Sequence, residues 1–182
     1  PRFLSPLALD DPATALALIR RELARLLLLV TGEAGPARDG TETTGPTADF
    51  ERLSTTIETF TSRLASRSPM SEADARQLHM LRSTLSGIRH LEEVVRIFTF
   101  RARVPGVIAP EQFERMTQGL AELLADMARA LDGNDSAAIV ALRDLTRIHG
   151  EAIEEIKRQL APPAGASPEQ SALLVDFEFF AW

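Results

Sequence analysis

Few residues in this chain of 182 amino acids have the chemistry of a catalytic or metal-binding site. The three histidines are His79, His90 and His149, and cysteine is absent, which excludes thiol catalysis, thiolate zinc sites and disulfide bonds. His90 stands three residues before Glu93, a spacing at which two metal ligands share one face of a helix. The same spacing is typical of an acid–base pair on a solvated helix face, which is the interpretation we favour.

Adjacent carboxylates occur at Glu92-Glu93 and at residues 154–155. Neighbouring side chains on a helix point about 100° apart, so neither pair alone can chelate a metal or act as a general acid and base. A metal site here would need a ligand from another helix, and Glu22 with His90 and Glu93 is the set that we consider. The nucleophile motif G-x-S-x-G and the phosphate-binding ending GK[ST] are absent. We therefore predict no catalytic residue and no cofactor.

A basic and aromatic cluster occupies residues 96–103. Arg96, Arg101 and Arg103 are interleaved there with two phenylalanines. Cations at the end of a helix complement its dipole, which is the simpler explanation of the cluster. Contact with an anionic partner surface, including lipid head groups, is the alternative. The whole chain has a net charge of −6, from 20 basic and 26 acidic residues, so we predict no nucleic-acid partner.

Six segments carry apolar residues at spacings of three and four, the pattern of an amphipathic helix. Asp11 and Pro12 are typical first residues of a helix, and Ser71 with Asp74 matches a capping box. Residues 31–47 are rich in glycine, proline and threonine, which predicts a flexible loop. The six helices are expected at about 12–31, 48–66, 71–104, 110–131, 135–160 and 167–182.

These helices, together with the absence of alternating strand patterns, predict an all-α fold. Helix count and loop placement predict two three-helix bundles, residues 1–104 with the loop at 31–47, and residues 105–182. We expect the second bundle to be truncated at its C-terminus, because the chain ends within an apolar pattern. The longest uninterrupted run of large apolar residues, alanine not counted, is residues 26–30, which is five residues long and much shorter than a membrane span.

Three phrases near the N-terminus together resemble a known junction. They read Pro-Arg-Phe-Leu-Ser-Pro at 1–6, Asp-Asp-Pro-Ala-Thr-Ala-Leu-Ala at 10–17 and Arg-Arg-Glu-Leu at 20–23. This order resembles the point at which bacterial sodium/phosphate cotransporters pass from their membrane domain into a C-terminal cytoplasmic domain similar to PhoU, the phosphate-uptake regulator. The rest of the chain agrees with that family in its helical architecture.

The resemblance implies two PhoU-like three-helix bundles that form a non-catalytic regulatory domain of a sodium-dependent phosphate transporter. It implies a place on the cytoplasmic side of the inner membrane and action by helix-mediated protein interaction. The expected partner is the transmembrane transport domain of the same polypeptide. Head groups of the inner leaflet would then lie close to Arg96, Arg101 and Arg103.

PhoU-like proteins also carry an acidic motif in each bundle, in which Glu or Asp is followed four residues later by Asp, and these acids can hold metal clusters. The matching stretch here is His-Leu-Glu-Glu-Val-Val-Arg at 90–96. Glu92 matches the first acid, whereas Arg96 replaces the closing Asp and puts a cation where a ligand is required. In the sixth segment, Asp176 is followed four residues later by Phe180, so this copy of the motif also lacks its closing Asp. We therefore do not carry metal binding over to this chain.

Two other classes of function fit parts of the sequence. One is a helical metalloprotein whose carboxylate–histidine site joins Glu22, His90 and Glu93 from two helices. The other is a plain helical interaction module that forms a homodimer through an apolar helix face, for which residues 173–182 are the candidate. We favour the transporter-linked regulatory domain over both.

Overall fold

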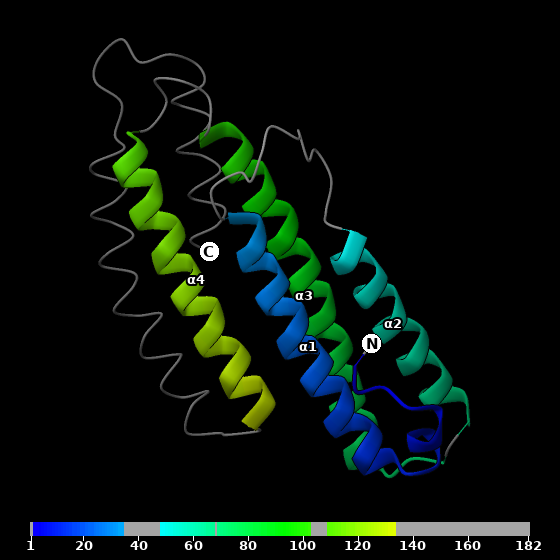
Figure 1. Ribbon diagram of the computed structural model, residues 1–182. Coiled ribbons are helices and arrows are strands. Elements are labelled where there is room, and N and C mark those ends of the chain that lie inside the picture. Colours follow the sequence, from blue (N-terminus) through cyan, green and yellow to red (C-terminus); the bar gives the residue numbers. More distant parts are fainter. Residues whose placement is uncertain (1, 35–47, 68, 103–108, 134–182) are drawn as a thin grey trace.

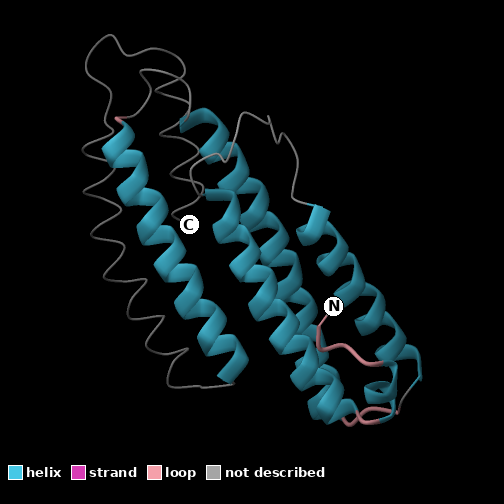
Figure 2. Ribbon diagram, in the orientation of Figure 1, coloured by secondary structure: helices cyan, strands magenta, loops and turns pink. Residues whose placement is uncertain are grey.

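Long helices lie side by side in the computed structural model of the chain, which describes residues 2–34, 48–67, 69–102 and 109–133 (Figure 1). The elements are the short 3₁₀ helix η1 (Pro6–Asp10) and the α-helices α1 (Pro12–Ala34), α2 (Ala48–Arg67), α3 (Glu72–Ala102) and α4 (Pro110–Gly133). The described residues contain no strand, which confirms an all-helical fold for them (Figure 2). The helices expected at 135–160 and 167–182 lie outside the described residues, so the arrangement of six helices in two bundles stays a prediction.

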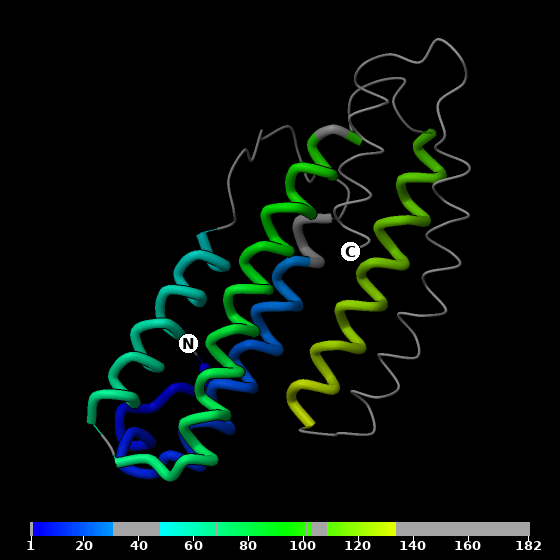
Figure 3. The backbone as a smooth tube through the Cα atoms, turned by 180° about the vertical axis from the view of Figure 1, so that it is seen from behind, coloured from blue at the N-terminus to red at the C-terminus, as the bar shows by residue number. Residues whose placement is uncertain are grey.

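Helix α1 is the central helix among the described elements. It contacts α2, α3, α4 and η1, and the view from behind shows α4 on one side of it and α2 and α3 on the other (Figure 3). Because neighbours cover α1 from several directions, its sequence is apolar on more than one face. The stripe that the spacing of three and four predicts is buried, namely Leu16, Ile19, Leu23, Leu26 and Val30. Ala15, Ala24 and Leu27, which lie beside the stripe, are buried as well.

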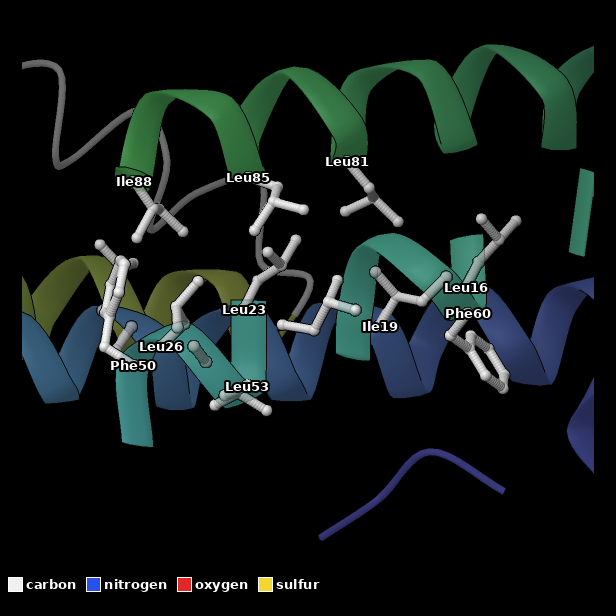
Figure 4. Packing of buried hydrophobic residues seen from close by; sticks show 14 of the residues in the cluster. Leu16, Ile19, Leu23, Leu26, Phe50, Leu53, Phe60, Leu81, Leu85 and Ile88 are labelled. Carbon is white, nitrogen blue, oxygen red and sulfur yellow. The ribbon is translucent and has the colours of Figure 1, made fainter. Parts of the chain in front are cut away.

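The hydrophobic core lies where α1, α2 and α3 meet (Figure 4). Each of these helices presents to the core the apolar stripe expected from its sequence, and Figure 4 shows the three sets interdigitating. Full burial of one such side chain contributes about 1.5–3 kcal/mol before conformational entropy is subtracted. Labelled in that view are Leu16, Ile19, Leu23 and Leu26 of α1, Phe50, Leu53 and Phe60 of α2, and Leu81, Leu85 and Ile88 of α3.

Both expected N-caps are present. The Asp11 carboxylate accepts hydrogen bonds from the Ala13 N–H at 3.2 Å and the Thr14 hydroxyl at 2.5 Å. The Thr14 hydroxyl is the main cause of a lowered pKa of Asp11, because its hydrogen bond favours the ionised carboxylate. At the start of α3, the Ser71 hydroxyl accepts from the Asp74 N–H at 3.1 Å and donates to the Asp74 carboxylate at 2.6 Å.

Two local features differ from the sequence expectation. Helix α1 continues to Ala34, so residues 31–34 of the expected loop are helical; a single glycine, Gly32, weakens a helix by about 1 kcal/mol but does not have to end it. The other difference is η1, which no apolar periodicity signals because it is only five residues long. Its first turn is capped by Ser5, whose Oγ accepts from the Leu7 N–H at 3.3 Å.

Helix α4 packs against α1, although the sequence assigns these helices to different bundles. Ala24 on α1 and Ala128 on α4 are both buried, and side chains this small let helix backbones approach closely. The buried positions of α4 are Leu124, Ala128 and Ala130. The residues that the spacing of three and four places on its apolar face are only half-buried, namely Phe113, Met116, Leu120, Leu123, Met127 and Leu131. The boundary expected at residues 104 and 105 lies outside the described residues and stays a prediction. Among the described helices, none is long and apolar enough to cross a membrane.

Candidate functional site

The most completely buried ionisable side chain in the described part of the chain is Glu22, on the middle of α1, with 0% of its surface exposed. One of its oxygens, Oε1, accepts hydrogen bonds from the backbone N–H groups of Arg2 and Phe3, both at 2.5 Å. The other oxygen, Oε2, accepts from the Arg25 guanidinium group at 2.5 Å. Hydrogen bonds to an ionised carboxylate are roughly twice as strong as neutral ones, so this side chain holds its three partners firmly.

Residues 2–5, which we call the N-terminal strap, reach Glu22 because the chain reverses direction through η1 (Figure 1). The turn is anchored by Ala8 and Leu9, which are buried in the core. It is also joined to the end of α2 by an ion pair between Asp10 and Arg67, with 3.3 Å between Oδ1 and Nη2. The strap then runs back alongside α1 to Glu22.

The aromatic ring of the strap is held by two arginines. The Cζ atoms of Arg2 and Arg21 lie 5.7 Å and 5.8 Å from the centroid of the Phe3 ring. Such cation–π contacts contribute about 0.5–1 kcal/mol at exposed sites. Arg21 also pairs with Asp132 in the last turn of α4, with 3.4 Å between Nε and Oδ1. The Glu22 site therefore joins the strap, α1 and, through Arg21, the end of α4.

The carboxylate oxygens of Glu22 accept from donors of the same chain. A general base or nucleophile needs a lone pair directed at a substrate, whereas the oxygens of Glu22 face two backbone amides and one guanidinium group. Two consecutive N–H groups that donate to the same carboxylate oxygen must converge on it, which a bent backbone allows, and the chain bends at Phe3. The site is therefore built to hold a peptide segment in place.

The residues predicted around the acidic motif of α3 are not brought together in one site. His90 and Glu93 are exposed, whereas Glu92 is buried and pairs on its own helix with Arg96, with 3.7 Å between Oε1 and Nε. Glu22 does not join His90 and Glu93. The described ranges contain no group of three or more His, Cys, Asp or Glu side chains that could hold a metal ion.

The basic and aromatic cluster at the end of α3 is divided between core and surface. Phe98 is buried, Phe100 is 65% exposed, and Arg96 is partly buried beside Glu92. The backbone of Arg101 belongs to α3, and Arg103 lies outside the described residues. Contact of these arginines with an anionic surface stays a prediction. His149, Asp176 and the apolar segment 173–182 also lie outside the described residues.

Sequence patterns single out Arg2 and Phe3 only through the resemblance. They single out Glu22 through the resemblance and as a candidate metal ligand, and they do not indicate that the three residues meet. A usable signal is the position of Glu22 on α1, three residues after Ile19 and four before Leu26, which are both buried. An acidic residue among core positions needs partners, because an unpaired charge is costly to bury. The identity of those partners depends on the reversal at η1, which the sequence pattern does not reveal.

No protein-family model, curated protein or solved structure matches this chain.

Proposed function

We propose that this chain is a non-catalytic regulatory domain of a sodium-dependent phosphate transporter. It would lie on the cytoplasmic side of the inner membrane and act through helix-mediated protein interaction, with the transmembrane transport domain of the same polypeptide as its partner. The observation that carries the proposal is a contact between two of the three phrases that resemble the cotransporter junction. Glu22, from the phrase at 20–23, binds the backbone of Arg2 and Phe3, from the phrase at 1–6.

This contact suits a domain that must sense what precedes it in the chain. A flexible linker absorbs displacement, because its end-to-end distance varies freely. The N-terminal strap instead has its backbone bound to α1, and α1 contacts every other described helix. A displacement upstream of Arg2 would therefore reach the helices directly, which supports a regulatory role over that of a passive attachment.

The coding sequence directly upstream of residue 1 provides the first test. We expect several apolar segments of about twenty residues each, the length that crosses a bilayer as a helix. An upstream region without such segments would contradict the proposal.

Uptake of radiolabelled phosphate by the full-length protein in proteoliposomes provides the functional test. We expect uptake to require a sodium gradient, and Glu22→Gln to change its rate by about twofold or more, because it weakens the bond between strap and α1. The matched control is Glu93→Gln, which neutralises an exposed carboxylate on α3 and should leave uptake unchanged. Absence of sodium-dependent uptake, or equal rates in wild type and Glu22→Gln, would contradict the proposal.

A further inference from the structure

The residues before Ser5 and the residues after it are held by different kinds of contact. Downstream of it, η1 buries Ala8 and Leu9 in the hydrophobic core. Upstream of it, Leu4 is the strap residue that packs against the core. The remaining attachments are the two amide bonds to Glu22 and the contacts of the Phe3 ring with two guanidinium groups. The strap is thus held by polar contacts in addition to the packing of Leu4, whereas η1 is held by the burial of Ala8 and Leu9.

These polar contacts can open separately from the helix packing. Amide groups of a released strap would bond to water instead of Glu22, at little net cost to the strap itself. Glu22 would keep Arg25 as its ion partner, because that guanidinium group comes from the same helix at i+3. The core positions Leu16, Ile19 and Leu23 lie where α1 packs against α2 and α3 (Figure 4).

We propose that Glu22, together with Arg21 and Arg25, forms a binding site for a bent peptide segment that directs two consecutive N–H groups at one carboxylate oxygen and carries an aromatic side chain. The N-terminal strap occupies this site within its own chain and leaves it while the helices stay packed. Arg21 contacts both the ring of Phe3 and the carboxylate of Asp132, so the end of α4 is joined to the occupied site. If the proposed function holds, release of the N-terminal strap from α1 is a step in the regulation. The peptide site itself does not require a transporter.

Amide hydrogen exchange of the full 182-residue chain, measured residue by residue by NMR, tests whether the strap opens alone. We expect the amides of Arg2 and Phe3 to exchange at least about tenfold more slowly than in an unstructured peptide, because Glu22 protects them. We also expect them to exchange at least about tenfold faster than the slowest amides of α1 and α2, because local opening requires less free energy than global unfolding. Unprotected strap amides, or strap amides as slow as the core, would overturn the proposal.

Variants then test whether Glu22 is the residue that holds the strap. Glu22→Ala should accelerate exchange at Arg2 and Phe3 by about tenfold or more, and Glu22→Gln, which keeps an acceptor oxygen, by less. Core amides of α2 should change by less than about twofold in both variants. The control Glu93→Gln should change neither group. Unchanged strap exchange in Glu22→Ala, or equal acceleration of strap and core, would count against the site.

Phe3→Ala supplies an independent variant in case Glu22→Ala fails to fold. It should also accelerate exchange at the Arg2 amide, because the ring and the backbone dock in one event. The double variant of Phe3→Ala with Glu22→Gln should then exchange more slowly than the product of the two single effects predicts, since coupled sites are not additive. Fully additive effects would show that the ring and Glu22 do not share a site. Because this experiment involves no phosphate transport, its failure is distinguishable from failure of the proposed function.

Discussion

Arg21 of α1 pairs with Asp132 of α4 while its guanidinium group lies over the ring of Phe3. The distance between Nε and Oδ1 is 3.4 Å, and Cζ is 5.8 Å from the ring centroid. One side chain thus contacts the N-terminal strap and the last turn of α4, which lie at opposite ends of the described part of the chain. This contact ties a helix that the sequence assigns to a second bundle to the central helix of the first.

Removing the ion pair should have a small effect on stability. Arg21 and Asp132 are each 55% exposed, and exposed ion pairs typically contribute about 0–1 kcal/mol. We therefore expect Asp132→Asn to lower the free energy of unfolding by about 0.5 kcal/mol or less in urea at low salt, and by less at about 1 M salt. A double-mutant cycle with Arg21→Gln isolates the pair. A salt-independent loss above about 2 kcal/mol would show that the contact is buried in solution.

Truncation of the central core should be far more costly than truncation at the surface of the same helix. Leu23 is fully buried, so Leu23→Ala should lower the free energy of unfolding by about 2–5 kcal/mol through lost burial and a cavity. Leu28 is 46% exposed, so the matched change Leu28→Ala should cost less than about 1 kcal/mol. Urea unfolding monitored by circular dichroism measures both. Similar losses in the two variants would argue against the orientation of α1 described above.

The cap of α3 should contribute measurably to stability. Ser71→Ala removes the acceptor for the Asp74 N–H and should cost about 1 kcal/mol in thermal or urea unfolding. The control is Ser83→Ala, at an exposed position within α3, where alanine favours the helix by up to about 0.5 kcal/mol. A loss in Ser83→Ala as large as in Ser71→Ala would mean that the cap is not the cause.

The Asp11 carboxylate that caps α1 predicts that the stability of the folded state decreases at acidic pH. The Thr14 hydroxyl, and with it the N–H groups of Ala13 and Thr14, lowers the pKa of Asp11 below its ordinary value of 3.8. A carboxyl group whose pKa falls on folding stabilises the folded state at pH values above its ordinary pKa. This stabilisation is lost as the pH falls through the lowered pKa.

Asp11→Asn keeps a capping side chain but cannot titrate. Urea midpoints measured between about pH 6 and about pH 2.5 should therefore fall less steeply below about pH 4 in Asp11→Asn than in the wild type. Identical profiles would contradict the role of the Asp11 carboxylate. Glu93→Gln, which removes an exposed carboxylate far from this cap in the sequence, is the control for general charge effects.

Local sequence information predicts the helices well because their signals are themselves local. The bounds of α2 differ by one residue from the expected 48–66, since an apolar stripe and a change in composition mark both of its ends. The caps at Asp11 and Ser71 depend on residues two or three positions away in the chain. By contrast, the end of α1 at Ala34 differs from expectation because a glycine only weakens a helix and does not decide where it ends.

The amino-acid sequence by itself determined that the described chain is helical, about where each α-helix begins and which face of α2 and α3 is apolar, because these properties follow from neighbours within one or two turns. Only the tertiary structure decided that α4 packs on α1 and that the amides of Arg2 and Phe3 bind Glu22. The partners of Glu22 are about twenty residues away along the chain, and they meet it only because η1 reverses the direction of the backbone. A buried carboxylate signals that it needs donors, but only the path of the chain selects them.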